Sequence, residues 1–190
     1  LREQDPGWLY ETDYYPLLSL GFANDVNLTT IYYFYTSPNG AFTTVQELNF
    51  KLAWDDSDAL GAWSMKPWVT VAWEQVNTSF GPNNGGVGLQ VGFGPTLYAA
   101  KDESFTLTAP IEAGFSIDDY YDDESGDNHG FGYASAGLLA SIPLTFMPEG
   151  AGDWTFSLSG KYFFFNEILE EANRGRGTYP VGMASLGVAF

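Results

Sequence analysis

The feature that most constrains the fold is an alternation of apolar and polar side chains with a period of two, which recurs from about residue 28 to the end of the chain. In residues 105–115, for example, Phe, Leu, Ala, Ile, Ala and Phe occupy every second position. Successive side chains of a β-strand point to opposite faces, so this pattern predicts strands with one apolar and one polar face. The sequence contains no run of about 18 apolar residues, as a transmembrane helix would need.

About nine such strands can be placed along the chain. Most contain the ~9–11 residues that a tilted strand needs to cross a bilayer, and several exceed the ~5–6 residues typical of globular proteins. Their predicted ranges are 14–22, 28–36, 41–54, 66–78, 86–99, 104–116, 131–146, 153–165 and 179–190.

The polar faces of these strands distinguish two kinds of all-β protein. A soluble antiparallel sandwich would show the same alternation, but its solvent face is usually rich in Lys, Glu and Asp. Here that face is mostly Gly, Ser, Thr and Gln, as in 88–94, 135–141 and 155–159. Small neutral residues suit a crowded interior, so we predict an all-β, antiparallel, up-and-down transmembrane β-barrel with lipid outside.

The few charges within the predicted strands fall on the polar face, most of them near mid-strand. A Lys or Arg that faced lipid at the bilayer midplane would cost about 2–4 kcal/mol, so we expect these side chains to face the lumen. Two interpretations remain open: a structural ion-pair network that fills a narrow barrel, or the lining of a water-filled path. The predicted lumen residues are Glu47, Lys51, Glu74, Gln90, Glu112 and Lys161.

Aromatic residues make up 17% of the chain and gather near the ends of the predicted strands. Amphipathic rings favour the headgroup zone of a bilayer, which predicts aromatic girdles at the two membrane boundaries. Ordinary packing would account for some of these rings, since aromatic residues are common in strands generally. The girdle residues that we predict are Trp54, Trp68, Tyr98, Trp154, Tyr179 and Phe190.

The last strand ends with Leu186, Val188 and Phe190 at alternate positions. It resembles the Phe-terminated strand that the barrel assembly machinery recognises in Gram-negative outer-membrane β-barrel proteins. The segment in which Tyr14-Tyr15 leads into Leu18-x-Leu20, followed by the aromatic stretch 30–38, is similar to that of the TorF-type putative porins. The resemblance implies a place in the bacterial outer membrane, contact with the lipid bilayer and lipopolysaccharide, and passive diffusion of solutes.

The connections between strands alternate between short and long in the second half of the chain, as expected for periplasmic turns and outer loops. Bacterial single-chain barrels have an even number of strands and begin in the periplasm. Counting back from a periplasmic C-terminus, the first visible strand would begin outside. We therefore predict that residues 1–190 form one barrel domain that lacks N-terminal strands, and that the intact barrel has 10 or 12.

Composition excludes several other activities. The net charge of −17 makes nucleic acid a poor partner, and the absence of cysteine excludes disulfides and thiol-ligated metals. The only histidine, His129, lies in a loop with no ordered partner for a catalytic triad, so we predict neither an enzyme nor a cofactor. Asp122, Asp123 and Asp127 are weak candidates for a divalent cation, because the calcium-loop spacing is incomplete.

The sequence therefore predicts an outer-membrane β-barrel that acts as a narrow passive porin for small solutes or as a structural membrane protein. The alternative is a soluble secreted β-barrel that carries a small apolar ligand, which would need an apolar interior and a charged exterior. A lipid-modifying barrel enzyme is a third hypothesis, which would need a histidine on a strand. The sequence leaves solute selectivity and the oligomeric state open.

Overall fold

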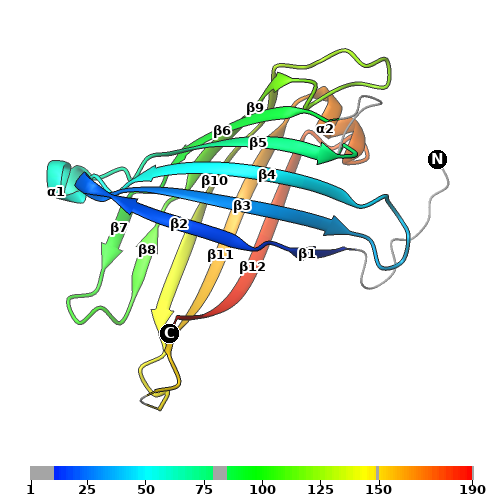
Figure 1. Cartoon of the computed structure of the whole chain (residues 1–190). Helices are drawn as coiled ribbons and strands as arrows, with labels where there is room; N and C mark the ends of the chain where they lie inside the picture. Colours follow the sequence, from blue (N-terminus) through cyan, green and yellow to red (C-terminus); the bar gives the residue numbers. More distant parts are fainter. Residues whose placement is uncertain (1–10, 79–84, 149, 190) are drawn as a thin grey trace. The chain divides into compact units, whose positions relative to one another are not determined.

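The computed structural model describes residues 11–78, 85–148 and 150–189, and these residues form a mostly β, antiparallel sheet (Figure 1). Its strands are β1 (Thr12–Tyr14), β2 (Leu17–Phe22), β3 (Val26–Thr36), β4 (Val45–Trp54), β5 (Trp68–Val76), β6 (Val87–Phe93), β7 (Thr96–Ala99), β8 (Thr106–Thr108), β9 (Ile111–Asp118), β10 (Phe131–Pro143), β11 (Asp153–Phe165) and β12 (Thr178–Ala189). The prediction of an all-β antiparallel fold is confirmed.

The strands follow one another in an up-and-down order, β1-β3-β4-β5-β6-β9-β10-β11-β12. Beside this path, β2 pairs with β3, and the β7–β8 hairpin joins the sheet through pairing of β8 with β10. The described helices are short: η1 (Ala23–Asp25), α1 (Ser57–Leu60), η2 (Gly61–Trp63) and α2 (Glu167–Ala172). None of the helices in this part of the chain has the length and apolar character needed to cross a membrane.

The described residues form an open sheet and not a closed barrel. The order of paired strands begins at β1 and ends at β12, and no described pairing joins these two ends. In agreement, every residue of β2 and of β12 is exposed. A barrel closes only when every strand pairs with a neighbour on both sides. A period-two alternation specifies the two faces of a strand, but it does not specify which strand pairs with its edge.

The nine predicted strands correspond to twelve observed ones because three of them are interrupted at proline. Pro16 separates β1 from β2, Pro95 separates β6 from β7, and Pro110 separates β8 from β9. Proline has no N–H to donate to a ladder and restricts the residue before it. The period-two pattern continues through each break, so the alternation alone does not reveal it.

The chain divides into two compact units, each described here by itself. The first consists of Leu1–Trp54, Trp68–Val91 and Gly114–Gly132, and in it β3, β4 and β5 lie side by side (Figure 1). Side chains directly opposite one another in an antiparallel pair share a face. On β4 and β5, the face of Glu47 and Glu74 is shielded, whereas Leu52 and Val71 on the other face are exposed.

The second unit consists of Asp55–Pro67, Gly92–Ala113 and Tyr133–Phe190, and its long strands are β10, β11 and β12. Leu138 on β10 and Leu158 on β11 are half exposed, at 51% and 56%. Ser135 on the opposite face of β10 is buried, and Lys161 lies on the same face of β11 as Ser157. In both units, therefore, the apolar face is the more exposed one.

The set of buried side chains is small and mostly polar. Among the described residues it contains four apolar members, Val45, Ala72, Tyr120 and Tyr121. Its seven polar or charged members are Glu47, Asn49, Asp56, Thr70, Glu74, Asp122 and Ser135. A globular domain buries its aliphatic residues and leaves charged ones outside, so the distribution of this chain is inverted.

Candidate functional site

The polar face of the first unit contains a carboxylate held by three donors. Glu47 on β4 is 4% exposed, and its Oε1 accepts hydrogen bonds from Asn49 Nδ2 at 2.5 Å and from the Tyr35 hydroxyl at 3.4 Å. Its Oε2 accepts a hydrogen bond from the Tyr120 hydroxyl at 2.5 Å. Hydrogen bonds to an ionised acceptor are stronger than neutral ones, which offsets the cost of burying the charge.

Three of the other predicted lumen residues lie on β4, β5 and β6. Glu74 on β5 is directly opposite Glu47 in the register and is 1% exposed. Lys51 lies further along β4, and its ammonium group is 4.6 Å from the centre of the Trp68 ring, which is a cation–π distance. Gln90 on β6 is partly buried. The structure thus places Trp68, which we predicted as a girdle residue, on the face of Lys51.

Tyr120 reaches Glu47 because the chain reverses direction after β9. Asp119 has a φ of 46°, in the left-handed region that few non-glycine residues adopt. The next residue, Tyr120, donates its backbone N–H to Ser116 Oγ at 2.9 Å. Burial, and then the charge of Glu47, raises the pKa of Tyr120 well above its usual value, so the hydroxyl remains a donor.

Glycines make room for the tyrosine rings of this turn. A Cβ added to Gly88 on β6 would lie 3.0 Å from three ring atoms of Tyr120, and one added to Gly132 on β10 would overlap the ring of Tyr121. The two rings also contact each other edge to face, with centroids 5.0 Å apart. The positions of both rings are therefore determined by packing against backbone.

The second unit contains the ion pair between two of the predicted lumen residues. Lys161 Nζ on β11 donates to Glu112 Oε1 on β9 at 3.0 Å, and the Ser135 hydroxyl donates to the same oxygen at 3.2 Å. The two charged side chains are 27% and 14% exposed, so the pair is neither fully buried nor freely solvated. Such a pair can position one side chain against the other and leave water access to both.

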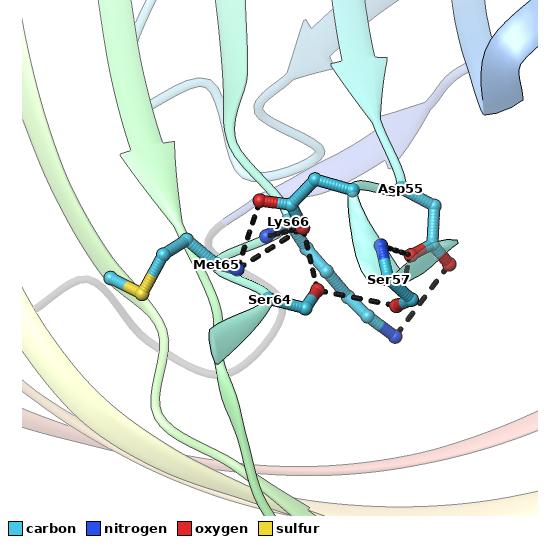
Figure 2. Close-up of polar contacts among 6 residues, drawn as sticks. Asp55, Ser57, Ser64, Met65 and Lys66 are labelled. Atoms are coloured by element: carbon cyan, nitrogen blue, oxygen red, sulfur yellow. Dashed lines mark hydrogen bonds and ion pairs between the residues drawn. The ribbon is translucent and has the colours of Figure 1, made fainter. Parts of the chain in front are cut away.

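The connection between β4 and β5 is organised by a buried carboxylate that sequence reasoning did not find. Figure 2 labels Ser64, Met65 and Lys66, which donate hydrogen bonds to this carboxylate, that of Asp56. Asp56 is 2% exposed and accepts hydrogen bonds from the Ser64 hydroxyl at 2.5 Å and from the N–H groups of Met65 and Lys66 at 3.1 and 2.9 Å. Burial alone would raise the pKa of Asp56, but these donors outweigh it and lower that pKa.

The acidic loop after β9 does not assemble the predicted cation site. Asp122 is 1% exposed, and its backbone forms a single antiparallel β-bridge with Asn128. The Asp123 carboxylate accepts hydrogen bonds from the backbone N–H groups of Ser125 and Asp127, and its Oδ2 lies 3.5 Å from His129 Nε2. Within residues 11–78, 85–148 and 150–189, no three His, Cys, Asp or Glu side chains are grouped closely enough to hold a metal ion. Asp123 therefore stabilises the turn of its own loop.

The remaining predicted girdle and assembly residues lie on the strands as follows. Trp54 and Tyr98 are exposed, at 40% and 58%, and the Trp154 indole donates to the carbonyl of Ala151. Tyr179 is opposite Phe163 in the register and therefore shares the face of Lys161. Leu186 and Val188 are opposite Phe156 and Trp154, on the apolar face, and Phe190 lies outside the described residues.

Sequence reasoning missed the two tyrosines of the turn, the Glu47 partner Asn49 and the buried carboxylate of Asp56. A signal was present for the tyrosines, since an adjacent aromatic pair is unusual in a loop of six acids. No family model matches the chain, and no curated protein and no solved structure shows significant similarity to it.

Proposed function

We propose that this chain is a bacterial outer-membrane protein, that its sheet forms the wall of a transmembrane β-barrel, and that it provides a narrow passive passage for small polar solutes. The single observation that supports this proposal most is the inverted burial. The shielded side chains are mainly polar, and the exposed large side chains are apolar along strand after strand.

The scale of the apolar exposure argues for a lipid environment. The exposed large hydrophobic side chains include Phe50, Leu52 and Val71 in the first unit, and Leu138 and Leu158 in the second. Contiguous apolar surface of this kind is rare on soluble monomers and marks contact with membrane or protein. A carrier of apolar ligands would show the opposite arrangement, with an apolar interior.

The lengths of the strands also support the proposal. β3, β4, β10, β11 and β12 contain 11, 10, 13, 13 and 12 residues. A tilted transmembrane strand needs about 9–11 residues to cross the hydrocarbon region. In lipid, the backbone groups of an open sheet edge would lack partners, so the free sides of β2 and β12 require further strands to complete the wall.

The test uses two lysine substitutions at adjacent positions of β11. Leu158→Lys places a charge on the exposed apolar face, and Ser159→Lys places the same charge on the face of Lys161. A Lys that faces lipid at the bilayer midplane costs about 2–4 kcal/mol, whereas a surface substitution in water stays within about 0.5 kcal/mol. We expect Leu158→Lys to impair folding into lipid vesicles far more than Ser159→Lys.

The readouts are flotation of the protein with vesicles and swelling of vesicles that contain small polar solutes. The wild-type chain and Ser159→Lys should float and admit solute. A chain that stays dispersed without detergent, or that tolerates Leu158→Lys as well as Ser159→Lys, would refute the membrane proposal. Flotation without any solute entry would leave a structural membrane protein.

A further inference from the structure

The segment that follows β9 does not extend away from the sheet. The strand ends at Asp118, and Asp119 takes a left-handed conformation, so residues 119–122 turn back; we call them the inward turn. The turn is held at its base by Tyr120 N–H to Ser116 Oγ and, further on, by His129 N–H to the carbonyl of Tyr121 at 2.9 Å. These two hydrogen bonds hold the backbone at Tyr120 and Tyr121, so the orientation of both side chains is defined.

The contacts of the inward turn span several strands of the first unit. Tyr120 follows β9, yet its hydroxyl contacts Glu47 on β4, and β5 and β6 lie between these strands in the sheet order. Three strand spacings correspond to about 14 Å along a flat sheet, which is more than a tyrosine side chain spans. The turn must therefore extend over the polar face of this unit.

The same face is adapted to receive the turn. Gly88 and Gly132 leave the space that the two rings occupy, and a Cβ at Gly86 would lie 2.6 Å from the carbonyl oxygen of Asp119. Glycine weakens a strand, and a close approach of another part of the chain is a reason to find it there. Tyr120 and Tyr121 are 9% and 4% exposed, so the turn lies in place and is not a free loop.

We infer that the inward turn occludes most of the passage along the polar face. Tyr120, whose hydroxyl donates a hydrogen bond to Glu47, is the residue that determines the width of this passage. This inference rests on the proposed function, because it requires that solutes move along that face. Without the Tyr120 ring, the space between Gly88 and Glu47 opens to water. Without its hydroxyl, the ring remains but loses its hydrogen bond to β4.

The experiment compares the single-channel conductance of Tyr120→Ala and Tyr120→Phe with that of the wild-type chain in planar bilayers. The same two substitutions at Tyr162, which is 45% exposed on the apolar face of β11, are the matched controls. We expect a several-fold rise in conductance for Tyr120→Ala and a smaller rise, or more frequent openings, for Tyr120→Phe. Both Tyr162 variants should conduct like the wild type.

A second measurement does not depend on conductance. The chain has no cysteine, so Gln90→Cys on β6 introduces a single thiol. A membrane-impermeant thiol reagent should label it slowly in the wild-type background and much faster in the Tyr120→Phe background. Tyr120→Phe keeps the ring that packs on Gly88, so it remains informative if Tyr120→Ala fails to fold.

Equal conductance of wild type and both Tyr120 variants, in proteins shown by flotation to be inserted, would overturn the inference and leave the proposed function intact. The same conclusion follows if inserted proteins show equal thiol labelling. If none of the inserted proteins conducts, the passage in the proposed function is refuted together with the inference. A wild-type chain that does not float would instead refute the proposed function, so the two failures are distinguishable.

Discussion

The ion pair between Lys161 and Glu112 offers the sharpest test of the energetics of the polar face. Lys161→Met keeps an unbranched apolar stem of similar length and removes the ammonium group. Glu112, whose side chain is 14% exposed, then retains only the Ser135 hydroxyl as a described donor. Its carboxylate loses the charge that is 3.0 Å away.

The size of the effect follows from the exposure of the pair. Removing one partner of a fully buried pair costs about 3–5 kcal/mol, and a fully exposed pair contributes about 0–1 kcal/mol. With side chains 27% and 14% exposed, this pair lies between the two limits, so we expect Lys161→Met to lower the free energy of unfolding by about 2 kcal/mol. Adding Glu112→Gln should restore most of the loss, because no unpaired charge remains.

The assay is urea unfolding of the protein in lipid vesicles, followed by tryptophan fluorescence and analysed by linear extrapolation. Thr155→Ser, on the same strand and the same face as Lys161, is the control and should change stability by less than about 0.5 kcal/mol. The reasoning is refuted if Lys161→Met is as stable as the control, or if the double variant is no more stable than Lys161→Met.

Two further outcomes follow from close contacts. Gly137→Ala would place a Cβ against the carbonyl oxygen of Gly160, so we expect the free energy of unfolding to fall by about 1–3 kcal/mol in the same urea assay. A Cβ at Gly160 would meet open space, so Gly160→Ala is the control and should be neutral or slightly stabilising. Equal effects of the two substitutions would contradict the β10–β11 packing. Asp56 has a pKa below its ordinary value of 3.8, so its contribution to stability is present above pH 3.8 and is lost as the pH falls through the lower folded-state pKa. Asp56→Asn should flatten the dependence of melting temperature on pH in that acidic range, and an unchanged pH profile would exclude this role.

Much of the candidate site could be assigned from the sequence because the faces of a strand follow from its alternation. Lys161 and Glu112 share the polar face by parity alone, and the structure brings their charged groups together. The sequence could not pair Glu47 with Tyr120, since these residues are 73 positions apart and lie on elements that are not adjacent in the sheet. The alternation of residues along a strand also could not show that Lys51 contacts Trp68.

The sequence by itself determined the class of secondary structure and which side chains share a face, because both depend on local periodicity along one strand. The openness of the sheet and the inward turn were decided only by the tertiary structure. Each of these features depends on which backbone groups find partners far away in the chain. That question is settled by packing across strands, and no short stretch of sequence contains the answer.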